Sequence, residues 1–70
     1  MPNKSMETVS TNVRNARMRS GFTQKELADK CGLSTNYISR IERADVSPTI
    51  DTLEKLVKTL KVKSSEILPF

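Results

Sequence analysis

Four polar side chains within six positions match the hydrogen-bonding groups on the edges of DNA base pairs: Thr35, Asn36, Ser39 and Arg40. Asparagine can bind adenine through two hydrogen bonds, and arginine can bind guanine in the same way. Threonine adds a hydroxyl group, and its methyl group can contact thymine. This set predicts direct reading of base pairs, provided that one element presents all four side chains on the same side. The alternative is a soluble surface with no ligand.

A short helix over residues 34–43 would present these side chains together. At about 100° per residue, Ile38 and Ile41 form an inward pair, and Ser34 can cap the helix. Four of the polar residues then project outward, and Thr35 and Tyr37 lie on the flanks. The outward residues are Asn36, Ser39, Arg40 and Arg43. Solvated helices more often carry glutamate and lysine at such outward positions, so the composition favours a reading surface.

Glu42 falls at the inner edge of this helix, where an unpaired carboxylate is costly. Arg17 lies near the apolar stripe of an earlier helix and is the natural partner. We therefore predict an ion pair with an architectural role. A solvated Glu42 is the alternative.

The preceding residues predict a second helix that crosses the reading helix steeply. Thr23 and Glu26 have capping-box spacing, so a helix should begin at Thr23 and end at Gly32. Only Gly32 and Leu33 then separate the two helices, and such a tight turn favours a helix-turn-helix over residues 23–43.

The rest of the chain predicts an all-α fold of four helices and a fifth short one. Val9, Val13, Ala16 and Met18 recur near helical spacing in a first helix from Thr8 to Ser20. Residues 1–6 read as a flexible N-terminal arm, and residues 7–70 as a single domain. A last short turn follows near residues 64–68. Thr49 would cap a fourth helix, whose apolar stripe contains Ile50, Leu53, Leu56, Val57 and Leu60.

Size, charge and composition narrow the functional classes. Twelve basic and eight acidic residues among 70 give a formal charge of +4 and a pI near 9.6, which suits a nucleic-acid binder. With one cysteine and no histidine, we expect no disulfide, structural metal or cofactor. Such a small core favours self-association. We also expect no membrane segment, a cytoplasmic location and no small-molecule ligand.

Two further features have plain structural explanations. Cys31 lacks a second cysteine or a histidine, so a small core residue is favoured over a redox or nucleophilic site. Lysines at positions 55, 58, 61 and 63 would form a solvated helix face, with phosphate contact as the alternative.

Ordered matches over most of the chain resemble one known family. They run from Gly21-Phe22-Thr23-Gln24 through Gly32-Leu33-Ser34 and Ile41-Glu42-Arg43 to Ser47-Pro48-Thr49. The chain is similar to the helix-turn-helix proteins typified by lambdoid phage Cro and repressor proteins (the XRE family). In size it resembles stand-alone phage repressors and restriction–modification controller proteins. The resemblance implies a compact lambda-repressor-like domain that binds operator DNA as a two-fold dimer.

The resemblance also implies roles for individual residues. It gives Thr35, Asn36 and Arg40 base-reading roles, and Ser39 either a base or a phosphate contact. It independently pairs Arg17 with Glu42 as a salt bridge. Contacts with phosphate are expected from four residues: Thr23, Gln24, Tyr37 and Arg43.

The C-terminal apolar residues are candidates for a dimer interface. Some of them must close the core, and the rest would form a self-complementary patch. The candidates are Leu60, Val62, Ile67, Leu68 and Phe70.

The leading functional prediction is a sequence-specific transcriptional regulator that is a homodimer on double-stranded DNA and regulates its own operon. The alternative is an antitoxin-type module that sequesters a partner protein. An enzyme is disfavoured, because no nucleophile–base pair or phosphate loop is recognisable.

Overall fold

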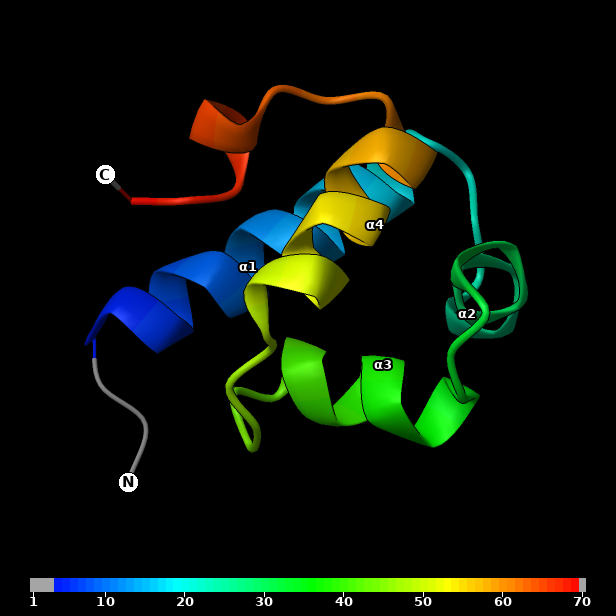
Figure 1. Ribbon diagram of the computed structural model, residues 1–70, viewed down its shortest axis with the longest axis horizontal. Helices are drawn as coiled ribbons and strands as arrows, with labels where there is room; N and C mark the ends of the chain where they lie inside the picture. Colours follow the sequence, from blue (N-terminus) through cyan, green and yellow to red (C-terminus); the bar gives the residue numbers. More distant parts are fainter. Residues whose placement is uncertain (1–3, 70) are drawn as a thin grey trace.

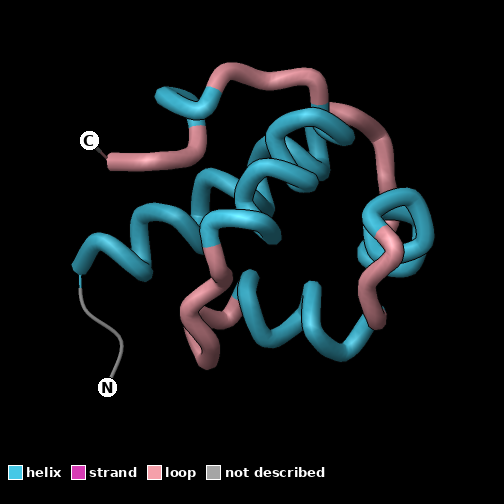
Figure 2. The backbone as a smooth tube through the Cα atoms, viewed as in Figure 1, coloured by secondary structure: helices cyan, strands magenta, loops and turns pink. Residues whose placement is uncertain are grey.

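The computed structural model describes residues 4–69. Within this range it contains four α-helices, one 3₁₀ turn and no strand, so the all-α prediction is confirmed (Figures 1 and 2). Helix α1 lies behind α4, α3 lies along one edge, and α2 is seen nearly end-on (Figure 1). The elements are α1 (Lys4–Arg19), α2 (Gln24–Cys31), α3 (Thr35–Glu42), α4 (Ile50–Leu60) and η1 (Ser64–Glu66).

Helix α1 begins at Lys4, four residues before the predicted start. The prediction of an arm is therefore wrong for residues 4–6, and residues 1–3 lie outside the described part. Met6 is half-buried and precedes Val9 at helical spacing, so it extends the apolar stripe of α1 by one turn. The hydroxyl groups of Thr8 and Ser10 donate to carbonyl oxygens four residues earlier, at 3.0 and 2.8 Å.

Local capping fixes where the next three helices begin. The hydroxyl oxygens of Thr23, Ser34 and Thr49 accept hydrogen bonds from backbone N–H groups in the first turns of α2, α3 and α4. The Glu26 carboxylate accepts a hydrogen bond from the Thr23 N–H at 2.8 Å and completes the predicted capping box. Gly32 ends α2 with a left-handed φ of 70°, which glycine adopts without strain.

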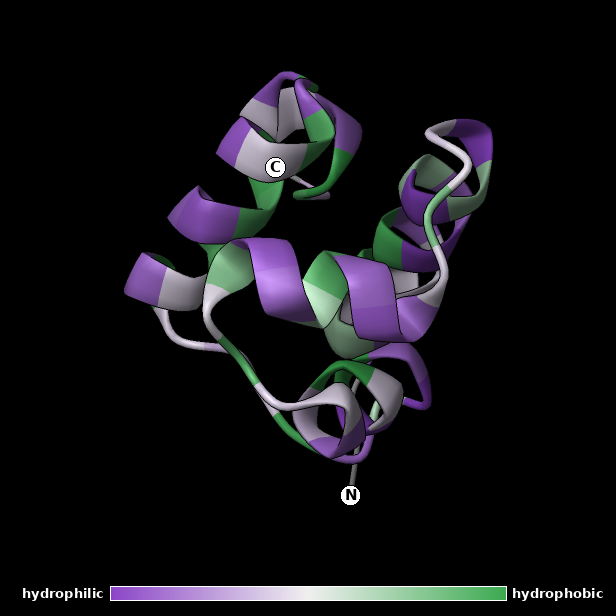
Figure 3. Cartoon of the chain, turned by 90° about the vertical axis from the view of Figure 1, so that its right-hand side faces the viewer, coloured by the Kyte–Doolittle hydropathy of each residue, from purple (hydrophilic) through white to green (hydrophobic). Residues whose placement is uncertain are grey.

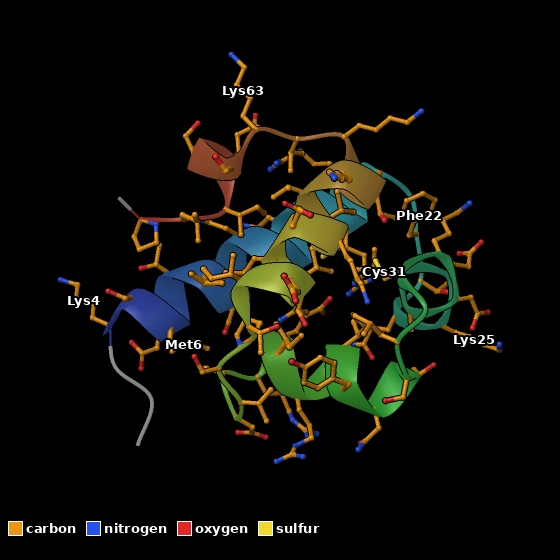
Figure 4. The ribbon with its side chains drawn as sticks, viewed as in Figure 1. Lys4, Met6, Phe22, Lys25, Cys31 and Lys63 are labelled. Carbon is orange, nitrogen blue, oxygen red and sulfur yellow. The ribbon has the colours of Figure 1, made fainter. Side chains whose placement is uncertain are left out.

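The core lies where α1, α2, α3 and α4 meet, with Ile67 closing one end. Each helix ribbon in Figure 3 alternates between hydrophobic and hydrophilic colour, as helices with one buried face do. Cys31 is in this core as predicted, with its Sγ 3.4 Å from the Thr59 Oγ1 (Figure 4). The buried apolar residues are Val9, Val13, Ala16, Leu27, Ala28, Cys31, Ile38, Ile41, Leu56, Leu60 and Ile67.

Two predicted core positions are wrong. Met18 is 59% exposed, because it lies off the stripe formed by Val13 and Ala16. Ile50 is 75% exposed at the first position of α4. Apolar residues cover a broad arc of α4, and the core packs against only one side of that arc. Leu56 lies on the packed side and is buried, whereas Ile50 lies outside it.

The C-terminal segment is attached to α1 and to the core. The Asn12 side-chain amide donates to the Ile67 carbonyl oxygen at 3.0 Å, across 55 positions of sequence. Leu60 and Ile67 are only 4% and 0% exposed, so the core of one chain already covers both. Their prediction as dimer-interface residues is corrected accordingly. Val62 and Leu68 are half-buried, and Phe70 lies outside the described residues.

Candidate nucleic-acid interface

Helix α3 has one fully buried side and one solvent-facing side. Ile38 and Ile41 are 0% exposed and attach the helix to the core. Asn36 and Arg40 are exposed on the other side, as the helical spacing predicted, and Thr35 is exposed as well. The buried pair therefore sets the orientation in which an amide, a hydroxyl and a guanidinium group reach solvent.

The flanking positions are more enclosed or already have partners. Tyr37 and Ser39 are half-buried, so Ser39 is less accessible than its predicted outward position implied. The Arg43 Nε lies 3.0 Å from the Asp45 Oδ2, and both side chains are more than half exposed. An exposed pair of this kind contributes about 0–1 kcal/mol, so Arg43 can exchange its partner for a phosphate at little cost.

The predicted ion pair between Arg17 and Glu42 is present and almost enclosed. The Arg17 Nε and Nη2 donate to the two Glu42 carboxylate oxygens at 2.7 and 3.0 Å, while Nη1 donates to the Phe22 carbonyl at 2.9 Å. The two side chains are 13% and 4% exposed. The pair joins α1 to the end of α3 and neutralises a carboxylate that would otherwise repel phosphate.

Gln24 adds a third member to this pair. Its Nε2 donates to the Glu42 Oε1 at 3.1 Å, so the first residue of α2 is bound to the last residue of α3. The family resemblance implied a phosphate contact for Gln24, and the contact with Glu42 was not predicted. Gln24 is half-buried at the start of α2, where backbone N–H groups favour anions.

Thr23 is exposed beside Gln24, but its hydroxyl already accepts the Glu26 N–H at 3.0 Å. Hydrogen bonds from the Thr23 backbone, and then from its side chain, lower the pKa of Glu26 below the ordinary value of 4.5. The nearby Lys30 lowers it further, against a small opposing effect of burial. Glu26 therefore stays ionised at neutral pH and supports the cap.

Helix α2 crosses α3 steeply, and only a short connection separates them (Figures 1 and 2). This arrangement brings the first turn of α2 beside the last residue of α3, because Gln24 contacts Glu42 directly. Sequence reasoning missed one feature outside this interface, the exposed apolar side of α4. The sequence contained a signal for this feature, because the apolar residues of α4 cover an arc too wide for one buried stripe.

A steeply crossed helix pair whose second helix exposes base-matching side chains defines a helix-turn-helix DNA-binding domain. A helix-turn-helix family model matches residues 13–67, and the chain belongs to that family. In residues 4–69, no helix combines the length and the apolar character needed to cross a membrane.

The chain is similar to several curated regulators. It is 39% identical over 59 residues to the control protein C.BamHI of Bacillus amyloliquefaciens, covering 83% of this chain and 73% of that protein. It is 35% identical over 57 residues to a hypothetical transcription factor of Neisseria meningitidis, covering 81% and 54%. The regulator ImmR of Bacillus subtilis is 38% identical over 56 residues, covering 80% and 44%. The chain therefore spans about half the length of the last two relatives.

Solved structures agree with the fold. The restriction–modification controller protein C.AhdI of Aeromonas hydrophila superposes with a TM-score of 0.88, covering 94% of this chain and 100% of that chain, at 23% identity. The wild-type controller protein C.Esp1396I superposes with a TM-score of 0.83 at 38% identity, covering 87% and 80%. The likeness to C.AhdI supports the fold alone, whereas C.Esp1396I is similar to this chain in both fold and sequence.

Proposed function

We propose that this chain binds operator DNA as a homodimer and regulates transcription, including that of its own gene. The observation that carries the proposal is the exposed polar side of α3, which is held rigidly by two buried isoleucines and an enclosed ion pair. A reading helix must keep its orientation to align hydrogen bonds with base edges, and this bracing supplies that orientation.

In the proposed complex α3 enters the major groove. Asn36 would bind adenine, Arg40 would bind guanine, and Thr35 and Ser39 would contact neighbouring base edges. The positioning contacts with phosphate would come from Thr23, Gln24, Tyr37 and Arg43. Phosphate contacts of this kind fix the register of the protein but carry no sequence information.

A two-fold dimer would place two such helices in successive major grooves about 34 Å apart. Each α3 would then lie about 17 Å from the symmetry axis, which one copy with dimensions of 27 × 24 × 20 Å can accommodate. The switch would be protein concentration, acting through dimerisation and operator occupancy. The proposal assigns the chain no catalytic step, cofactor or small-molecule ligand, and it assigns a cytoplasmic location.

Selection from a pool of randomised duplexes, followed by footprinting, tests the proposal. We expect one preferred site with two related half-sites about one helical turn apart. A pool that remains random after repeated selection would contradict sequence-specific binding. Co-purification of a second protein that blocks DNA binding would instead favour the antitoxin-type alternative.

A further inference from the structure

The loop after α3 carries an exposed acid at the edge of the proposed DNA-binding surface. Residues 34–49 contain two acids, Glu42 and Asp45. The side chain of Glu42 is enclosed by Arg17 and is 4% exposed, whereas that of Asp45 is 51% exposed. Within residues 34–49, Asp45 is therefore the carboxylate that can face a phosphate.

The backbone holds Asp45 beside the last turn of α3. Its N–H donates to the Arg40 carbonyl oxygen at 2.9 Å, and the N–H of Ala44 donates to the Ile41 carbonyl oxygen at 3.0 Å. Ala44 has a left-handed φ of 61°, a conformation that residues with a Cβ atom rarely adopt. This tight turn leads the chain from α3 toward α4 (Figure 1). The position of Asp45 is thus set by the end of α3 itself.

The stability of the fold gives no reason for an acid at this position. Asp45 follows the C-terminus of α3, where the helix dipole favours cations and disfavours anions. Its ion-pair partner is Arg43, whose Nε lies 3.0 Å from the Asp45 Oδ2. Because an exposed pair contributes little to folding, the carboxylate is better explained by its effect on Arg43.

We infer that Asp45 is a specificity-determining residue, which neutralises Arg43 unless a phosphate lies at the position that operator binding fixes. On a random duplex the protein is held loosely by charge, and Arg43 stays with Asp45. On the operator, base contacts fix the register, and a phosphate replaces Asp45 as the partner of Arg43. Both side chains are more than half exposed, so this exchange needs no change in the core. The inference rests on the proposed function, which gives Arg43 a phosphate contact.

The salt dependence of DNA binding tests this role, with affinities measured by fluorescence anisotropy. Each phosphate contact steepens the slope of log K against log salt concentration by about 0.9, because counterions are released. Asp45→Asn should steepen the slope on a random duplex by about this amount, since the freed Arg43 adds a contact there. The slope on the selected operator should stay unchanged, because Arg43 already binds phosphate in that complex. A purely structural role would not distinguish the two duplexes.

Affinities at about 50 mM salt give a second readout. At this salt concentration one added phosphate contact corresponds to about a 15-fold rise in the affinity of Asp45→Asn for the random duplex. The rise on the operator should be about fivefold or less, because only an exposed ion pair no longer has to be broken. Asp29→Asn is the matched control, since Asp29 also forms an exposed pair at 3.0 Å, with Lys25 in α2. It removes the same charge and should leave both slopes unchanged.

A double variant tests whether Asp45 acts through Arg43. In an Arg43→Gln background, Asp45→Asn should no longer steepen the slope on the random duplex. A slope that still steepens would mean that Asp45 acts through general charge, and would overturn the inference. Circular dichroism and the urea midpoint of Asp45→Asn should match those of the unchanged chain, since the backbone bond to Arg40 is retained.

The outcomes separate this inference from the proposed function. In a chain that prefers its operator, equal steepening on both duplexes would overturn the role of Asp45. An unchanged slope on the random duplex, or the same effect from Asp29→Asn, would also overturn it, and operator binding would stand in all three cases. A chain with no preference among duplexes would refute operator binding, and the inference would fall with it.

Discussion

Removing one member of the Arg17–Glu42 pair should cost a large fraction of the free energy of unfolding, whereas replacing both should cost little. In Glu42→Leu the Arg17 guanidinium, 13% exposed, loses both carboxylate hydrogen bonds and keeps only the Phe22 carbonyl. Stranding a buried charge costs about 3–5 kcal/mol. We expect about 3 kcal/mol, because Arg17 retains some access to water. A 70-residue domain has roughly 4–10 kcal/mol in total, so the loss is a large fraction.

Urea unfolding followed by circular dichroism measures this loss directly. The double variant Arg17→Met/Glu42→Leu should recover most of the stability, because well-packed apolar pairs replace buried ion pairs at little or no cost. Glu54→Ala is the matched control, since Glu54 and Lys58 form an exposed pair at 3.5 Å. It should change the free energy of unfolding by about 0.5 kcal/mol or less.

Two results would refute this reasoning. A loss below about 1 kcal/mol for Glu42→Leu would mean that the pair behaves like a solvent-exposed one. A double variant as unstable as the single variant would mean that the two side chains do not act through each other.

Four further perturbations address the reading surface and the helix ends. Arg40→Ala should weaken operator binding by about 1–3 kcal/mol and relax preference at one base pair per half-site, measured by competition with altered duplexes; equal loss on random DNA would contradict base reading. Gln24→Ala should weaken operator and random duplexes alike, and a selective loss would exclude a phosphate role. Because hydrogen bonds to Thr23 lower the pKa of Glu26, its contribution is complete above pH 4.5 and lost as pH falls through the lower folded value. The urea midpoint of Glu26→Gln should therefore depend less on pH in this acid range, and an unchanged dependence would argue against the cap. Lys61→Gly should stabilise the protein by about 0.5–1 kcal/mol, since Lys61 ends α4 at a left-handed φ of 57°; a lower urea midpoint would contradict this.

The features that sequence predicted best are those fixed by neighbouring residues. Thr23, Ser34 and Thr49 cap helices because a hydroxyl two or three positions before free N–H groups is sufficient by itself. Ile38 and Ile41 are buried because three-residue spacing puts them on one side of a helix. The exposure of Asn36 and Arg40 follows from the same periodicity.

Features that depend on the shape of the whole core were harder to predict from the sequence. The α4 arc is apolar over more than one side, and only the packed structure determines that Leu56 is buried while Ile50 is exposed. The contact between Gln24 and Glu42 spans 18 positions and depends on the crossing of α2 and α3. Neither of these relations has a local pattern.

The ratio of affinities for a selected site and for random duplex, at one fixed salt concentration, tests the central claim most directly. If α3 reads base pairs, this ratio should be at least about 1000, in the range of sequence-specific DNA-binding proteins. Equal affinities, or no binding to any duplex at low ionic strength, would show that the exposed side of α3 does not read base pairs.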